Sequence, residues 1–237
     1  MKFITILSPL FIVSSVLSFS FHNNLSKFSK REITSDITPE CQNEIDTSKD
    51  YLDCYGVKIT TTNYKEVCDT IATDRCQKII KDPFIAIPSC KNDKVFVENL
   101  LTPLAIEYNI HQVPLVCSFD SKGNLCPAGE AAINHELINE LVVFQTCKSK
   151  KCSDSARQYF EFILNNADDL GSSGIIRGLN NMDGSTAAKL VYGTLLKQLN
   201  DEKCKARNEE NDSSDAEIVK VTYLLSIIIT LALISLL

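Results

Sequence analysis

The chain has 237 residues, of which 44% are hydrophobic, and a formal net charge of −6 at pH 7. This length is enough for one compact core. An acidic chain with no basic stripe and no patch of mixed basic and aromatic residues disfavours nucleic acid and anionic lipid headgroups as partners.

The first residues have the pattern of a secretory signal peptide. A lysine at position 2 precedes a short apolar run, and Ser18-Phe19-Ser20 supplies the small residues that a signal peptidase reads. We therefore expect a signal peptide over residues 1–20, cleaved after Ser20. Residues 21–31 form a candidate propeptide, because Lys30 and Arg31 make a dibasic site in a polar stretch. Two solvated charges explain this pair equally well.

The cysteines number ten, an even count that in an exported chain predicts disulfides in preference to metal ligands. Five lie at or before Cys90 and five at or after Cys117, so an odd number of bridges must cross residues 91–116 if all pair within the chain. This parity predicts a single cysteine-rich helical domain over residues 32–204, and it leaves the pairing open. The ten are Cys41, Cys54, Cys68, Cys76, Cys90, Cys117, Cys126, Cys147, Cys152 and Cys204.

In the first half of the domain, Asn63-Tyr-Lys-Glu66 predicts the start of a helix in the style of a capping box. That helix should carry Val67, Cys68, Ile71 and Cys76 and end before Pro83. Prolines punctuate the chain from Pro83 to Pro114, and the turn-rich residues 113–129 predict an irregular or hairpin-like segment.

Helical periodicity dominates the second half, where three apolar stripes predict helices that face a common core. Ser153 and Ser185 stand at the expected N-caps of the second and third helices. Cys147 to Cys152 forms a tight polar turn, and Gly171 to Gly184 a flexible connection. The fold class is therefore mainly α: a small disulfide-stapled helical domain with irregular or short β-hairpin segments. The stripes are Ile133, Leu137, Leu141 and Phe144; Ala156, Phe160, Ile163 and Ala167; and Ala188, Val191, Leu195 and Leu199.

The last residues have the pattern of a glycosylphosphatidylinositol (GPI) attachment signal. After a short polar linker at 205–211, residues 212–237 combine small residues, a polar spacer and an uncharged apolar run. Asn211 is the favoured attachment residue, narrowly ahead of Ser214. The alternative is a retained single-pass helix over residues 219–237, which would normally be followed by lysine or arginine.

Candidates for chemistry are few, and each has a simpler explanation. His111 and His135 are expected to be surface histidines, because no second histidine completes a His-Glu-x-x-His motif. Residues 171–174 lack the Gly-x-Ser-x-Gly order of a nucleophile elbow, and residues 181–184 lack the flanking oxygen ligands of a calcium loop. Asp168-Asp169 offers half of a carboxylate pair without an identifiable partner. We predict no catalytic residue, no metal site and no cofactor.

These features predict a eukaryotic, GPI-anchored, cysteine-rich protein on the outer face of the plasma membrane, reached through the secretory pathway. Its expected role is structural, adhesive or interactive, with the outer leaflet, cell-wall or matrix components, or another surface protein as partners. The first alternative is a carrier of a small apolar ligand (a lipid, a sterol or haem). The second is a membrane-tethered hydrolase. Sequons at Asn24 and Asn211 predict little N-linked glycan, because the first lies in the candidate propeptide and the second competes with the anchor.

Overall fold

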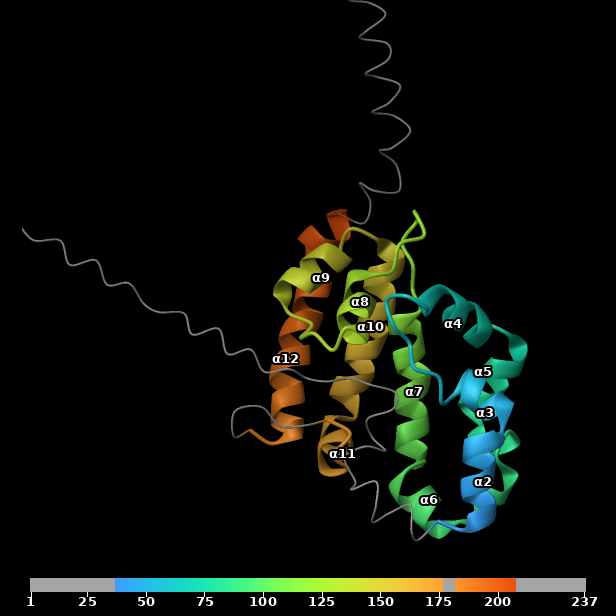
Figure 1. Cartoon of the computed structure of the whole chain (residues 1–237). Helices are drawn as coiled ribbons and strands as arrows, with labels where there is room; N and C mark the ends of the chain where they lie inside the picture. Colours follow the sequence, from blue (N-terminus) through green and yellow to red (C-terminus); the bar gives the residue numbers. More distant parts are fainter. Residues whose placement is uncertain (1–36, 177–181, 208–237) are drawn as a thin grey trace, which may run out of the picture.

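The computed structural model describes residues 37–176 and 182–207, and these are mainly helical (Figure 1). The predicted fold class is confirmed at this level. Within the described ranges the only extended pairing is an isolated bridge between Phe119 and Leu125. No strand is found among the described residues, and both ends of the segment 113–129 are helical. Residues 117–126, between two helices, form a turn closed by this one bridge, which we call the hairpin.

The helices divide into two groups, which we call the N-terminal lobe and the bundle (Figure 1). Each group has its own main core, a third small cluster surrounds Cys54 and Cys76 in the lobe, and Ile80 of the lobe packs into the bundle core. The lobe comprises α2 (Pro39–Thr47), α3 (Lys49–Cys54), α5 (Asp74–Lys81), α6 (Lys94–Asn99) and the 3₁₀ helices η1 (Pro83–Ile85) and η2 (Pro88–Asn92). The bundle comprises α4 (Tyr64–Ile71), α7 (Pro103–Val116), α8 (Pro127–Ile133), α9 (Glu140–Thr146), α10 (Lys150–Asn165), α11 (Ala167–Ser172) and α12 (Gly184–Leu199).

The lobe consists of short elements whose ends are fixed by side chains. Proline stands in the first turn of α2, η1 and η2, where its missing N–H costs nothing. Ser48 and Thr73 accept backbone N–H groups at the starts of α3 and α5. Asp93 does the same for α6, accepting from the N–H of Phe96 at 2.9 Å. Each cap satisfies an amide that a short helix otherwise leaves unpaired.

The single helix predicted from Asn63 onward is wrong in its extent, because the chain forms α4 and α5 with a break between them. Thr73 adopts an extended backbone and its hydroxyl accepts from the N–H of Cys76, which starts a new helix. Asn63 does not cap α4 with its side chain. Its amide oxygen accepts instead from the N–H of Thr60 in the preceding turn, at 2.7 Å.

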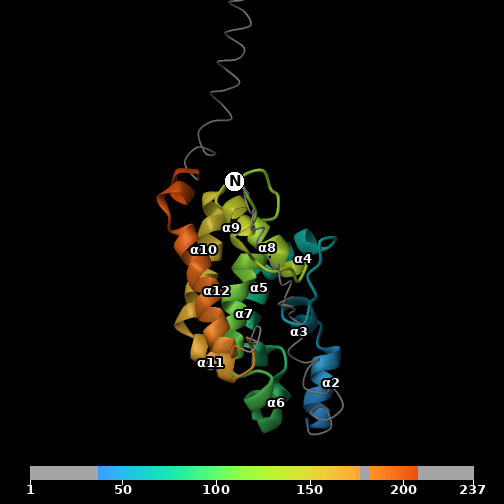
Figure 2. The same cartoon turned by 90° about the vertical axis from the view of Figure 1, so that its left-hand side faces the viewer.

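Two of the three predicted apolar stripes are confirmed in the bundle. Phe160 and Ile163 of α10 are fully buried, and Leu195 and Leu199 of α12 are buried opposite them. The caps differ from prediction: α10 begins four residues earlier, behind Ser149 instead of Ser153, and α12 is capped by Asp183 instead of Ser185. Figure 2, seen from the side of α12, shows α10, α11 and α12 lying along one another.

The third stripe, from Ile133 to Phe144, does not form one helix. The chain leaves the helical path after α8, where His135 has a positive φ of 58°, and re-enters it at α9 behind the cap Asn139. As a result Leu141 is 66% exposed and Phe144 40% exposed, although both were expected in the core. The break turns the α9 face that carries them towards solvent.

All ten cysteines are paired. Cys68–Cys117 is the one bridge that crosses residues 91–116, in agreement with the odd number that parity requires. The lobe holds two bridges and the later part of the bundle the other two. They are Cys41–Cys90 and Cys54–Cys76 in the lobe, and Cys126–Cys152 and Cys147–Cys204 in the bundle.

The centre of the bundle is filled by aromatic rings. The hydroxyls of Tyr108 on α7 and Tyr159 on α10 share a hydrogen bond of 3.0 Å, and both side chains are buried. Burial raises the pKa of the Tyr108 hydroxyl above its usual range, so it stays neutral. Phe160 and Tyr192 of α12 complete the cluster with ring centroids 5.3 Å apart.

The described part of the connection predicted to be flexible is tightly packed where α11 meets α12. A Cβ added at Gly184 would lie 2.3 Å from the carbonyl oxygen of Ile176, and one at Gly171 would lie 2.5 Å from the amide nitrogen of Ser185. Only glycine allows the two backbones to approach this closely. Gly171 thus serves helix packing, and residues 171–174 lie at the end of a helix and not between a strand and a helix as a nucleophile elbow does.

Candidate interaction surface

The processing residues predicted from the sequence lie outside the described residues. These are Ser20, Lys30 and Arg31 before the domain, and Asn211 and Ser214 after it, together with the apolar segment 219–237. Within residues 37–176 and 182–207 no helix has the length and apolar character that crossing a bilayer requires.

The other candidate residues have unrelated structural roles. The ring of His111 stacks on Phe162 with centroids 4.3 Å apart, and His135 sits in the connection between α8 and α9. Asp168 forms an ion pair with Lys189 at 2.7 Å and accepts a hydrogen bond from Ser185, which together lower the pKa of its carboxyl. Asp183 is the cap of α12. Among the described residues no His, Cys, Asp and Glu side chains gather as a metal site would need.

One end of the bundle brings together segments that are distant in sequence. The hairpin 117–126 is joined to the start of α10 by Cys126–Cys152. The end of α9 is joined to the turn that follows α12 by Cys147–Cys204, with Cα atoms 5.0 Å apart. We call this assembly, made of residues 117–126, 144–152 and 200–207, the basic end.

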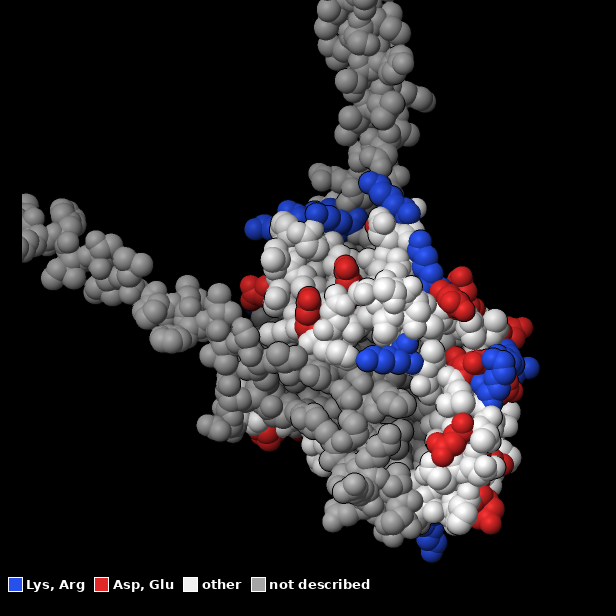
Figure 3. All heavy atoms as spheres, viewed as in Figure 1, with Lys and Arg blue, Asp and Glu red and all other residues white. Residues whose placement is uncertain are grey.

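The basic end concentrates positive charge in an acidic protein. Two short stretches, 148–151 and 201–207, together carry six basic residues and two acidic ones. In Figure 3 blue side chains gather along this upper edge, whereas red ones are scattered over the rest of the visible face. The basic residues are Lys148, Lys150, Lys151, Lys203, Lys205 and Arg207; the acidic ones are Asp201 and Glu202.

A surface hollow of about 610 Å³ lies between the hairpin and the first turns of α10. Its charged lining is mixed, with Lys150 and Lys151 facing Asp120 and Asp154 across several serines. Burial raises the pKa of the Asp154 carboxyl, but hydrogen bonds from Lys150 and Arg157 outweigh it, so the net pKa is below the usual range. Asp154 is thus an anion that orients Lys150, 2.6 Å away.

Apolar side chains adjoin this charge. Leu141 and Phe144 are one helical turn apart on the outer face of α9. The guanidinium of Arg207 lies over the Phe144 ring, 3.7 Å from its centroid, an arrangement that attracts a cation to the ring face. The outer face of α9 is therefore continuous with the basic end.

The sequence shows only half of this surface. The run Lys148-Ser-Lys-Lys151 is visible as a tight polar turn, whereas Lys203, Lys205 and Arg207 come some fifty residues later. They join the first group because Cys147 pairs with Cys204, and that pairing cannot be read from the sequence.

Five disulfides in a chain without a free cysteine define a disulfide-braced helical protein matured in an oxidising environment, such as that of the secretory pathway. No protein-family model matches the chain, and no curated protein or solved structure matches it either. Its role is therefore argued from its own residues.

Proposed function

We propose that this chain is a GPI-anchored, cysteine-rich protein of the cell surface, with a structural, adhesive or interactive role. The observation that carries the proposal is the position of the basic end. The last described residue, Arg207, belongs to a short helical segment, 202–207, that is bridged to α9, and Asn211 follows only four residues later. A small, polar and then apolar pattern comes directly after this covalently closed end.

An interactive role is supported by the surface of the bundle more than a carrier role is. A carrier needs an apolar space between its helices. Where α7, α10 and α12 meet, Tyr108, Tyr159, Phe160 and Tyr192 fill the interior. The distinctive chemistry of this protein lies on its surface, where basic residues adjoin the exposed side chains of Leu141 and Phe144.

A phosphatidylinositol-specific phospholipase tests the anchor on the full chain expressed in a eukaryotic cell. We expect the enzyme to release the protein from the cell surface and the C-terminal peptide of the released protein to end at Asn211. Resistance to release, with the peptide 219–237 still present in the membrane fraction, would instead establish a spanning helix.

Two matched variants identify the attachment residue, because anchor transfer requires a small side chain at that position. We expect Asn211→Lys to abolish surface display and Ser214→Lys to leave it largely intact. The reverse result would assign the anchor to Ser214.

A further inference from the structure

We infer that the basic end lies against the phosphate layer of the bilayer, with its lysine and arginine side chains on lipid phosphates and with Leu141 and Phe144 at the headgroup boundary. The inference rests on the proposed lipid anchor, and it adds the orientation of the domain and the chemistry of a second membrane contact. The opposite end of the molecule, which includes α2 and α6 of the lobe, then faces outward (Figures 1 and 2).

Chain length places the basic end near the membrane. Four residues separate Arg207 from Asn211, and four extended residues span at most about 14 Å. Figure 1 shows the turn after α12 at one end of the molecule and α6 at the other. An anchor at Asn211 therefore holds the basic end closer to the bilayer than any part of the lobe.

The charge of this end fits a layer of phosphates. The basic end as a whole carries seven basic residues against three acidic ones, since the hairpin adds Lys122 and Asp120 to the two lysine-rich stretches. Blue side chains gather along the upper edge of Figure 3. One acidic residue, Glu202, is already paired with Lys205 at 2.8 Å. Attraction to a charged surface is effective within about 10 Å at moderate salt. A net charge of −6 would disfavour this contact if the charge were spread evenly over the surface. The basic residues are instead concentrated at one end.

The apolar side chains favour lipid over a charged polysaccharide as the partner. A polyanionic glycan would pair with the lysines and leave Leu141 in water, where it is 66% exposed. A headgroup layer offers phosphates to the basic residues and an apolar boundary to Leu141 and Phe144. Arg207 over the Phe144 ring joins the two kinds of contact in one place.

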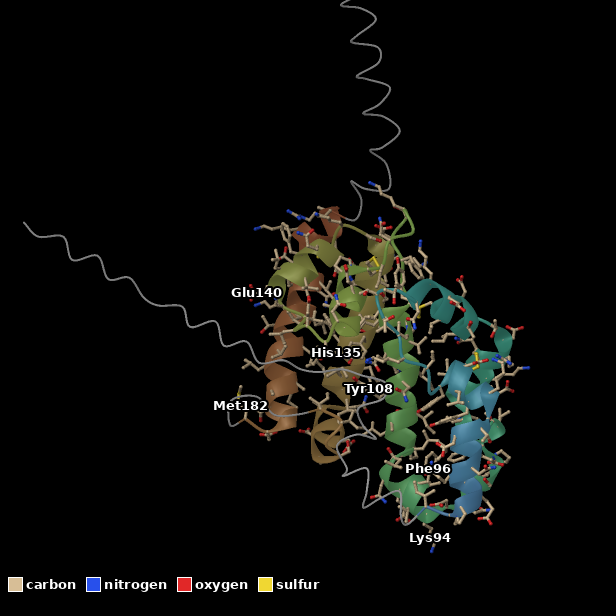
Figure 4. All side chains as sticks on the ribbon, in the orientation of Figure 1. Lys94, Phe96, Tyr108, His135, Glu140 and Met182 are labelled. Carbon is tan, nitrogen blue, oxygen red and sulfur yellow. A yellow bond between two sulfur atoms is a disulfide. The ribbon has the colours of Figure 1, made fainter. Side chains whose placement is uncertain are left out.

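Lysine footprinting on the full chain tests the contact. Protein in membranes, and protein reconstituted into vesicles of phosphatidylcholine with phosphatidylserine, is treated with an amine-acetylating reagent and compared with protein in detergent. We expect Lys151 and Lys203 to be several-fold less acetylated in both bilayers than in detergent. Lys91 and Lys94, exposed at the far end of the molecule where Figure 4 labels Lys94, serve as internal controls and should react equally throughout.

Equal acetylation of Lys151 and Lys203 in vesicles and in detergent would overturn the inference. Protection on intact membranes that is lost in pure lipid vesicles would overturn it as well, in favour of a glycan or a protein partner. This readout stands apart from the anchor, because reconstituted protein reports on the basic end whether or not phospholipase releases it.

Charge-matched double variants give a second readout, which is binding to the same vesicles. The protein for this measurement is released by phospholipase or collected from the medium. Lys151→Glu with Lys203→Glu should weaken binding at least about tenfold, since each basic residue near an anionic surface contributes about fivefold. Lys91→Glu with Lys94→Glu makes the same change in net charge and should alter binding less than about twofold. Equal effects of the two pairs would contradict a localised contact, and Leu141→Ser without effect on binding would contradict the apolar part of it.

Discussion

The N-terminal lobe and the bundle are stabilised by different means. No helix of the lobe is longer than the nine residues of α2, a length at which an isolated helix is marginal in water. The bundle has α10 and α12 with sixteen residues each around a buried aromatic centre. The lobe relies on two disulfides and on side chains that hold backbone ends around a small core, whereas the bundle combines its three disulfides with extensive burial.

Carboxylates carry much of the lobe's internal bonding. Thr38 donates its N–H to Asp93 at 2.7 Å, and Ser89 donates its N–H to Glu44 at 2.8 Å. In each case one side chain joins segments at least 45 residues apart. The comparison teaches that a lobe with a small core can be ordered by a few directional contacts, and that such order should be lost selectively.

The largest expected effect separates the two cores. Phe160→Ala in the bundle should lower the free energy of unfolding by about 3–5 kcal/mol, because the packed rings around it cannot close the cavity. Phe96→Ala, at an equally buried ring in the lobe, should cost less because a small core of short elements can collapse onto the space. Urea denaturation followed by circular dichroism measures both. A greater loss from Phe96→Ala would refute the distinction.

Removal of a disulfide should expose backbone amides in the lobe and should leave those of α10 in the bundle protected. Replacing Cys41 and Cys90 by alanine should cost about 2–4 kcal/mol, and a similar cost is expected for Cys126 and Cys152. The difference should appear in amide hydrogen exchange. Loss of the Cys41–Cys90 bridge should expose the amides of α2 and η2, which have little other support. Loss of the Cys126–Cys152 bridge should not expose the amides of α10, because packing protects them. Uniform loss of protection in both variants would show that the two groups unfold as one unit.

Glycine substitutions sharpen the description of the bundle. Gly184→Ala should destabilise by about 1–3 kcal/mol, because its Cβ would meet the Ile176 carbonyl oxygen at 2.3 Å. Gly193→Ala, in the same helix, should stabilise by up to about 1 kcal/mol, since its Cβ meets only Leu164 at 4.0 Å. Thermal melting compares the pair. Equal behaviour would mean that the α11–α12 contact can relax.

The smallest expected effect is the loss of stability on acidification that comes from Asp93. Burial raises the pKa of the Asp93 carboxyl, but hydrogen bonds from Thr38 and Phe96 outweigh it, so the pKa is below its usual value. Its stabilisation is therefore complete above the unfolded pKa of about 3.9 and is lost as the pH falls through the lower folded value. Asp93→Asn should cost about 1 kcal/mol at neutral pH.

The test of this pH dependence is the difference in unfolding free energy between wild type and Asp93→Asn. It should shrink as the pH falls below about 4, because protonation removes the advantage of the wild type. A difference that stays constant between neutral pH and strong acid would show that the charge of Asp93 is immaterial to the lobe.

Sequence periodicity predicted the two longest helices, α10 and α12, and failed at α7 and at several short helices. Both α10 and α12 are uninterrupted helices of sixteen residues, so the apolar residues spaced at the helical period lie on one face and are buried together. The stripe from Ile133 to Phe144 keeps its phase across a break at His135, and nothing in the spacing reveals the positive φ there. The sequence does not reveal α7, because Pro103 and Pro114 suggest an interrupted segment and Pro114 lies inside the helix, where a proline removes one backbone hydrogen bond.

The candidate surface could be predicted only in part, for a different reason. A lysine-rich turn is a local property of sequence, but the second group of basic residues reaches it through a long-range pairing of cysteines. Net charge also conceals the arrangement, because it averages one basic region over a chain that is acidic as a whole. The lobe's polar contacts, such as Thr38 with Asp93, are equally long-range and leave no periodic trace.

The Cys147–Cys204 bridge has a mechanical consequence. Tension applied to the chain beyond Arg207 enters at Cys204 and crosses the sulfur–sulfur bond to Cys147, so residues 148–203, including α10, α11 and α12, bear none of it. Towards the N-terminus the load runs along residues 118–146 and crosses again from Cys117 to Cys68, which leaves α7 unloaded. A tether at this end can therefore be pulled while the aromatic centre of the molecule remains at rest.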